Sequence, residues 1–395
     1  MRDSLGAVFW TFLALGLTSF GGPIAHLGYY RREFVERRRW LTESAYADLV
    51  ALCQFLPGPA SSQVSFAVGL SRAGLAGGLA AWAGFTLPSA LLMVLFAFAA
   101  ARIEGPVALG ALHGLKIVAV AVVAQAVWGM ARSLAPDRER ASIAVLATLV
   151  VTFAATAVGQ IAAIALGGLL GLRLCRDSAA APAGALPMIV PRGVAWACLA
   201  AFFLLLVGLP VAARAGVGHG VMVFEAFYRA GALVFGGGHV VLPLLEASVV
   251  APGWVTRDAF LAGYGAAQAV PGPLFTFAAY LGAVMGPAPN GWLGAALCLV
   301  AIFLPGLLVL TGALPFWDAF RRQAWAQATM RGVNAAVVGI LLAALYHPVW
   351  TSAILRPRDF ALALVAFALL TAGQVPAWVV VLVTALGGVA LTLAP

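Results

Sequence analysis

The chain has 395 residues, of which 63% are hydrophobic and only 9% are charged, and its mean hydropathy is +1.01. This composition excludes a water-soluble fold of ordinary kind. The 23 basic and 14 acidic residues give a net charge of +9, but the basic residues occur in short clusters between long uncharged stretches. That distribution argues against a nucleic-acid partner.

Long uncharged stretches dominate the chain. Six of them contain no Asp, Glu, Lys or Arg: 73–101, 141–172, 193–213, 259–317, 332–355 and 360–395. Each is long enough to cross a hydrocarbon core, which takes about 20 helical residues. Because nothing alternates like a barrel strand, we expect an all-α polytopic membrane protein with about 10–13 membrane segments.

The sequence repeats itself at a shift of 214 or 215 residues. Phe20-Gly21-Gly22-Pro23 returns as Phe235-Gly236-Gly237-Gly238, Trp40-Leu41-Thr42 as Trp254-Val255-Thr256, and Pro57-Gly58-Pro59 as Pro271-Gly272-Pro273. We therefore expect two homologous halves, 4–174 and 219–394, joined by a linker at 175–218 that holds one extra helix. Since residues 5–22 match 220–237, the N-terminal apolar run is expected to belong to the fold rather than to a cleaved signal peptide.

The loop charges of the two halves differ in sign and position. After the first helix, half one carries Arg31, Arg32, Arg37, Arg38 and Arg39, whereas the counterpart 239–256 carries only Glu246. Half two in turn has Arg321, Arg322 and Arg331, where half one has only Arg102 beside Glu104. Because positive loops favour the cytoplasmic side, this pattern predicts an inverted repeat.

The Pro-Gly-Pro elements predict a break in a helix of each half. Proline stops a helix, so we expect new half-helices to begin at Pro59 and Pro273, with free N–H groups and a positive dipole end directed into the protein. Such an end binds anions. The predicted anion-binding residues are Gln54, Gly58, Pro59, Ala60, Ser61, Ser62 and Gln63 in half one, and Gln268, Gly272, Pro273 and Thr276 in half two. The alternative is that these prolines only kink helices for packing.

Glycine clusters follow the first helix of each half and are a second candidate lining for the site. The residues concerned are Gly21, Gly22, Gly237 and Gly238. Their backbone would either line the same cavity or let two helices approach closely.

Lys116 is the only lysine and lies in an apolar run. A charge near the middle of the bilayer costs at least about 2.5 kcal/mol unless it faces a cavity or a partner, so we predict a role in anion binding. Asn334 occupies the equivalent place in half two and is included with it. The alternative is that Lys116 snorkels to an interface.

Four further charged residues are candidates for coupling an ion to transport: Asp48, Glu246, Glu225 and Arg229. Glu225 and Arg229 are four residues apart, which favours a simple ion pair on one helical face. Asp48 and Glu246 are either proton acceptors or polar residues at helix ends. We interpret His26, His113 and His239 as interfacial side chains.

Signatures of catalysis and cofactor binding are missing from the sequence. The only lysine follows Leu115, which excludes the G-x-x-x-x-G-K-[ST] motif for ATP. Cys53, Cys175, Cys198 and Cys298 are scattered and form no metal-binding or disulfide pattern. We expect no catalytic residues, no metal and no cofactor, and hence no enzyme.

Several long motifs resemble the chromate ion transporter (CHR) family in its long two-domain form. They are Phe20-Gly21-Gly22-Pro23-Ile24-Ala25-His26, Arg38-Arg39-Trp40-Leu41, Cys53-Gln54-Phe55-Leu56-Pro57-Gly58-Pro59-Ala60-Ser61-Ser62-Gln63, and the second-half pairing of Phe235-Gly236-Gly237-Gly238-His239 with Gln268-Ala269-Val270-Pro271-Gly272-Pro273. The resemblance covers both halves. It implies a multi-pass secondary transporter that exports chromate across the inner membrane and confers chromate resistance, with sulfate as the obvious analogue.

Three alternatives remain open at this point. The first is a carrier of sulfate or another oxyanion, the second is a polytopic enzyme acting on lipid phosphates, and the third is a passive anion channel. The expected partners are chromate, sulfate as a competing anion, and membrane lipid, with no nucleic acid; a homodimer is one assembly that the sequence allows. When the potential is negative inside, moving a dianion outward releases about 4.6 kcal/mol per 100 mV, so uncoupled efflux is downhill over roughly a thousandfold gradient. The sequence leaves open whether protons or a counter-anion take part.

Overall fold

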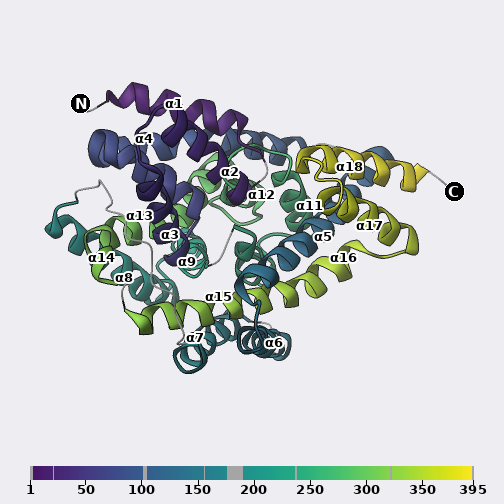
Figure 1. Ribbon diagram of the computed structural model, residues 1–395. Helices are drawn as coiled ribbons and strands as arrows, with labels where there is room; N and C mark the ends of the chain where they lie inside the picture. The colour runs from purple at the N-terminus through teal and green to yellow at the C-terminus, as the bar shows by residue number, and fades with distance from the viewer. Residues whose placement is uncertain are drawn as a thin grey trace.

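The computed structural model describes residues 3–20, 22–100, 105–154, 156–175, 190–235, 238–320 and 323–393. These residues form helices and turns, and none of them lies in a strand, which confirms the all-α prediction (Figure 1). Gly21, Gly237, Arg102, Glu104, Arg321 and Arg322 lie outside the described residues.

The first half begins with short elements and continues with long helices. Its elements are α1 (Leu5–Thr18), α2 (Gly22–Arg31), the π-helical η1 (Arg32–Arg37), α3 (Glu43–Phe55), α4 (Ala60–Ala100), α5 (Pro106–Leu134), α6 (Arg138–Phe153) and α7 (Ala157–Leu174). The backbone of α4 leaves helical geometry at Ala73 and Gly74, so α4 consists of two helical pieces. The extra helix predicted in the linker is α8 (Arg192–Arg214).

The second half repeats this order with more interruptions. Its elements are α9 (His219–Ala232), η2 (Gly238–Val240), α10 (Val241–Leu245), η3 (Glu246–Val250), α11 (Arg257–Ala267), η4 (Leu274–Thr276), α12 (Phe277–Val284), α13 (Gly291–Ala313), η5 (Leu314–Phe316), α14 (Trp317–Phe320), α15 (Ala324–Ala344), η6 (Leu345–Trp350), α16 (Thr351–Ala353), α17 (Pro357–Thr371) and α18 (Ala377–Leu393).

One helix cap recurs at the matching position of the two halves. The Thr42 hydroxyl accepts a hydrogen bond from the Ala45 N–H at the start of α3, and the Thr256 hydroxyl accepts one from the Ala259 N–H at the start of α11. Both threonines satisfy an amide that a helix leaves without an intrahelical acceptor. This shared cap agrees with two homologous halves, while the bounds 4–174 and 219–394 stay a prediction.

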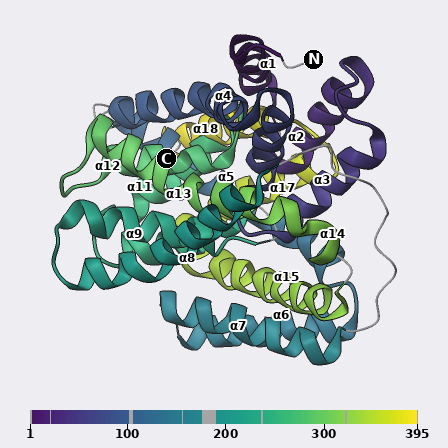
Figure 2. The same cartoon turned by 90° about the vertical axis from the view of Figure 1, so that its left-hand side faces the viewer.

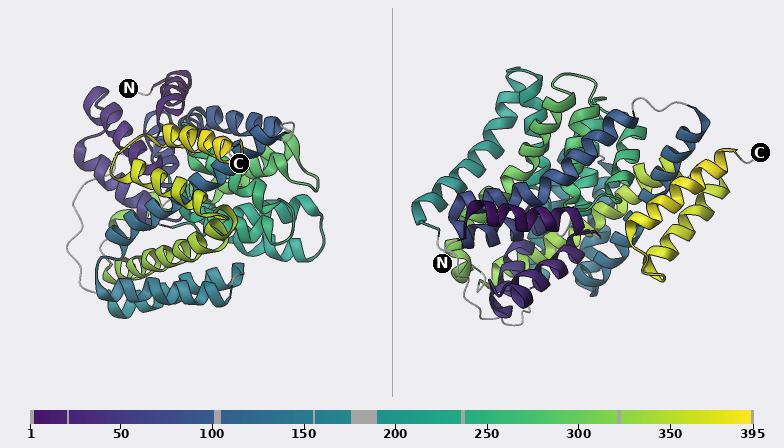
Figure 3. Two further views of the ribbon diagram at one scale, coloured as in Figure 1. Left: turned by 90° about the vertical axis from the view of Figure 1, so that its right-hand side faces the viewer. Right: turned by 90° about the horizontal axis from the view of Figure 1, so that it is seen from above.

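The long helices exchange partners between the halves. α5 of half one packs along α17 and α18, and α15 of half two packs along α6 and α7 (Figures 1 and 2). The contacts are close because glycines meet backbone. A Cβ on Gly114 would overlap the carbonyl oxygen of Thr384, and a Cβ on Gly332 would overlap that of Gly167. The C-terminal pair α17–α18 thus lies at one end of the molecule, yet it packs on a helix of the first half (Figure 3).

The backbone of each Pro-Gly-Pro break is likewise hydrogen-bonded to the opposite half. The Gly58 N–H donates to the carbonyl oxygen of Val234, just after α9, at 2.8 Å, and the Gly272 N–H donates to that of Ser19, just after α1, at 2.9 Å. Both glycines have positive φ, +122° and +96°, which other residues rarely adopt. Each break is therefore held by the first helix of the opposite half.

Among the described residues, five helical segments are long and apolar enough to span a membrane: Ala60–Ala100, Pro106–Leu134, Arg192–Arg214, Gly291–Phe316 and Ala324–Ala353. Five shorter apolar helices accompany them: Leu5–Thr18, Val158–Leu174, Val241–Val250, Leu274–Val284 and Ala377–Leu393. The total of 10–13 membrane segments and the inverted orientation of the halves stay predictions.

The helix exchange predicts a sharp difference between two glycines of α5. Gly114→Ala places a methyl group against the Thr384 carbonyl, and we expect it to destabilise the protein by about 1–3 kcal/mol. Gly129→Ala is the matched control, because no atom lies within 4 Å of a Cβ there. Thermal unfolding of both variants in detergent measures the difference, and equal melting temperatures would contradict the exchanged packing.

Candidate functional site

The first break opens α4 with a buried polar turn. Ser61, Ser62 and Gln63 are 3%, 0% and 0% exposed. The Gln63 side-chain amide donates from Nε2 to the carbonyl oxygens of Pro57 and Gly306, each at 2.9 Å. Gln63 therefore joins the break of half one to α13 of half two, and its backbone lies in the first turn of a helix whose leading N–H groups have no intrahelical acceptor.

Several buried oxygen atoms around the breaks have no hydrogen-bond partner within the described part of the chain. They are Ser19 Oγ, Ser62 Oγ, Gln63 Oε1 and Thr86 Oγ1, all on residues that are 0% exposed. Buried polar atoms almost always have partners, so such a group needs a physical reason. A polar ligand that accepts hydrogen bonds would supply one for the three hydroxyls, but not for Gln63 Oε1, which itself only accepts.

His26 connects the two breaks. Its Nε2 lies 3.2 Å from the Ser19 carbonyl oxygen, which also accepts from the Gly272 N–H, and its Nδ1 lies 3.4 Å from Ser61 Oγ. A carbonyl oxygen only accepts, so a neutral His26 donates from Nε2 and its Nδ1 accepts from the Ser61 hydroxyl. His26 is fully buried, so its interpretation as an interfacial residue is wrong. The sequence did not indicate that His26 joins the two breaks, because its contacts involve residues that are far apart in the chain.

The second break is less polar than the first. The expected half-helix at Pro273 begins with the 3₁₀ turn η4 before α12, because the Thr276 N–H and hydroxyl both bond back to the Pro273 carbonyl oxygen. The Gln268 amide contacts the Tyr264 carbonyl oxygen at 3.4 Å. At a shift of 214, Phe275 stands where half one has Ser61, and Thr276 stands where it has Ser62. The breaks share a positive-φ glycine, but only one of the two hydroxyl groups of the first turn is kept in half two.

Lys116 lies at a different place from the breaks. Its Nζ donates to Asp258 Oδ1 at 3.0 Å, and its side chain is 13% exposed. The pair lines a cavity of about 310 Å³ together with His113 and Tyr280. Asp258 is in the first turn of the 11-residue helix α11, whereas Gly272 follows its last turn, so the pair is about 16 Å along the helix from the break.

The remaining predicted residues have varied environments. Glu225 and Arg229 form the ion pair expected from their spacing, at 2.6 Å, and Glu246 lies 3.6 Å from Arg257. Asp48 is 3% exposed on α3, while Gln54 is exposed at the end of the same helix. Gly22 and Gly238 begin the helical segments after the first helix of each half.

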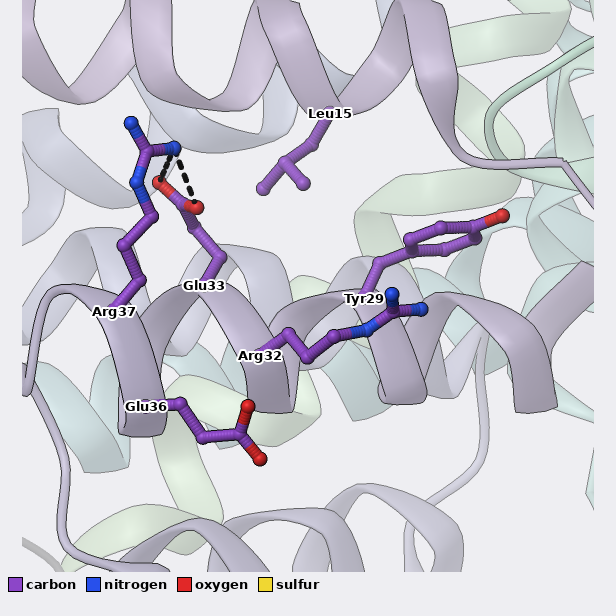
Figure 4. A pocket seen from close by; sticks show the side chains of 6 residues that line it. All are labelled: Leu15, Tyr29, Arg32, Glu33, Glu36 and Arg37. Atoms are coloured by element: carbon purple, nitrogen blue, oxygen red, sulfur yellow. Dashed lines mark hydrogen bonds and ion pairs between the residues drawn. The ribbon is translucent and has the colours of Figure 1, made fainter.

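The arginine-rich segment after α1 forms an open hollow of about 480 Å³ (Figure 4). Its charges largely neutralise one another: Arg37 is paired with Glu33 at 3.0 Å, while Arg32 stacks over Tyr29. Partial burial alone would raise the pKa of Glu33, but hydrogen bonds from Arg38 and Arg37 outweigh it and hold that pKa below its ordinary value. This balance makes the hollow a poor anion site.

Metal ligation has no support in the described residues, where no group of three His, Cys, Asp or Glu side chains could hold an ion. The four cysteines are free thiols.

The two glutamines beside the first break should differ in their effect on stability. Gln63→Leu removes the two hydrogen bonds that its amide donates to the Pro57 and Gly306 carbonyl oxygens, so we expect a loss of about 1–3 kcal/mol. Gln54→Leu, at an exposed position, should change stability by less than about 0.5 kcal/mol. Thermal unfolding in detergent tests this, and an unchanged Gln63→Leu variant would show that the bridge to α13 is not needed.

Comparison with known proteins places the chain in a family. The family model described as "Chromate transporter" matches twice, over residues 6–172 and 221–389. A "Chromate transport protein" of Pseudomonas aeruginosa is 31% identical over 342 residues, covering 85% of this chain and 78% of the relative. A "Chromate transport protein" of Cupriavidus metallidurans is 25% identical, covering 85% and 80%. An "Uncharacterized transporter" of Methanocaldococcus jannaschii is 22% identical, covering 85% and 82%. No solved structure matches.

Proposed function

Because this chain belongs to the chromate transporter family, we propose that it exports chromate across the inner membrane and so confers chromate resistance. The chain is a multi-pass membrane protein of a transporter family. Chromate as its cargo, the outward direction and the inner membrane are the parts that we propose.

The observation that carries the proposal is the buried polar turn at the first break. Chromate is a tetrahedral dianion, and a helix N-terminus offers it N–H donors and a favourable dipole. The amides of Ala60, Ser61 and Ser62 lead α4, and the Ser62 hydroxyl lacks a partner among the described residues. We assign the anion to this turn, and we assign the second break, whose Thr276 hydroxyl is bonded internally, a structural role.

The outward direction follows from the charge of the cargo. An inside-negative potential favours loss of a dianion by about 4.6 kcal/mol per 100 mV, which is equivalent to a concentration ratio of roughly a thousandfold. Sulfate has the same shape and charge, so it is the competitor that tests selectivity. The site as proposed needs no covalent step and no cofactor.

The experiment is chromate flux in proteoliposomes under an imposed potential, with wild type, Ser62→Ala and Ser71→Ala. Loss of a hydrogen bond to a charged ligand costs about 1.5–3 kcal/mol, so we expect Ser62→Ala to raise the half-saturating chromate concentration about tenfold or more. Ser71→Ala, on the same helix with its hydroxyl bonded to the Val68 carbonyl, should behave like wild type.

Four outcomes of this experiment are informative. Saturable chromate flux that sulfate inhibits weakly supports the proposal. Preferential transport of sulfate would show that sulfate rather than chromate is the cargo. Conductance without saturation would indicate a channel. Unchanged kinetics in Ser62→Ala would remove the first turn of α4 as the binding site.

A further inference from the structure

One helix–helix contact between the halves has no counterpart in the described part of the chain. α11 of half two packs on α5, whereas its counterpart α3 has no comparable packing on α15, the counterpart of α5. The α5–α11 contact is tight, since a Cβ on Gly265 would overlap the Leu115 carbonyl oxygen. The Lys116–Asp258 ion pair closes the same contact.

The face of α3 that corresponds to this contact is open. Ser44, Ala47, Ala51 and Gln54 lie at spacings of three, four and three residues, which places them on one side of the helix, and all four are exposed. We call them the α3 stripe. Their counterparts at a shift of 214 are Asp258, Leu261, Gly265 and Gln268, of which Leu261 and Gly265 are buried.

A buried orphan atom lies on the helix that should face the α3 stripe. Asn334 on α15 corresponds to Lys116 at a shift of 218, the same shift that relates Gly332 to Gly114. The Asn334 Oδ1 atom is buried and has no hydrogen-bond partner among the described residues. Ser44, which corresponds to Asp258, carries an exposed hydroxyl that lies 3.2 Å from Thr42 Oγ1 and can donate to the Asn334 Oδ1 atom instead.

We propose that the α3 stripe is the docking surface for α15 of the same chain, in a second conformation where Ser44 bonds Asn334 and the α5–α11 contact opens. This inference rests on the proposed transport function. The two contacts would then close alternately on either side of the breaks, which both halves hold jointly. Rocking of repeats around a fixed site is the general way in which such repeats give alternating access.

The chemistry of the α3 stripe favours α15 over lipid or a second copy. Small residues such as Ala47 and Ala51 let two helices approach closely, as Gly265 does in the other half. Lipid tails could cover the alanines, but they would leave the Asn334 amide oxygen without a donor. Only α15 carries Asn334, the counterpart of Lys116, which pairs with Asp258 in the α5–α11 contact.

The test is a disulfide between Ser44→Cys and Asn334→Cys in the full chain reconstituted in proteoliposomes. The matched control is Glu43→Cys with Asn334→Cys, because neighbouring residues point about 100° apart around a helix. A positive control is Lys116→Cys with Asp258→Cys, whose side chains already touch. Joined peptides identified by mass spectrometry report each bond, so the native cysteines stay in place.

We expect the Ser44–Asn334 pair to cross-link within one chain, faster than the Glu43 control, and to stop anion flux until a reductant is added. Cross-linking no faster than the control would overturn the proposal, and so would Ser44→Cys disulfides that join two copies. The cross-link is measured without chromate. It would still form if the cargo were another anion, which separates this inference from the proposed function.

A second measurement uses a variant that weakens the α5–α11 contact and carries no engineered cysteine there. Lys116→Asn with Asp258→Ser removes the ion pair and gives both sides the same residues. An ion pair with one exposed partner contributes up to about 1 kcal/mol, so we expect the Ser44–Asn334 cross-linking rate to rise about two- to fivefold. An unchanged or lower rate would contradict the alternation.

Discussion

The reciprocal hydrogen bonds of the two Pro-Gly-Pro breaks are the constraint on which the rest of the structure depends. Gly58 donates to Val234 and Gly272 donates to Ser19, so each break is completed by the opposite half. Inside a membrane protein, non-helical backbone must find its partners in protein or in a water-filled cavity. Neither half can therefore hold its own break, and the exchange of α5 and α15 between the halves extends the same dependence to the long helices.

This constraint explains which features could be predicted from the sequence. Proline restricts the backbone locally, so the breaks at Pro57-Gly58-Pro59 and Pro271-Gly272-Pro273 could be predicted. The caps at Thr42 and Thr256 were not predicted, although both threonines lie in a repeated motif. Apolar composition fixed the class of fold, since only helices and closed barrels span lipid. The exchange of helices was not predictable in this way, because an apolar face shows that a helix is buried but not which helix covers it.

The same limit applies to the site. The free-energy cost of burying a charge in the bilayer predicted that Lys116 needs a cavity or a partner. In the structure that partner is Asp258, 142 residues away in the chain. The structure also places that pair away from the breaks, so the positive charge and the half-helix end are separate parts rather than one site. His26 was missed for a related reason: its partners, Ser19 and Ser61, are adjacent only once α1, α2 and α4 have packed.

The Lys116–Asp258 pair lies away from the Pro-Gly-Pro breaks, and this position suggests a physical reason why only one half carries the pair. A buried cation at close range would attract the proposed dianion strongly in a low-dielectric interior and so would slow its release. Amides and hydroxyls at the break bind more gently. The Lys116–Asp258 pair instead contributes to a helix contact, where a partly exposed ion pair contributes up to about 1 kcal/mol. In the alternation that we propose, loss of a contribution of that size would change the ratio of the two conformations by at most about fivefold.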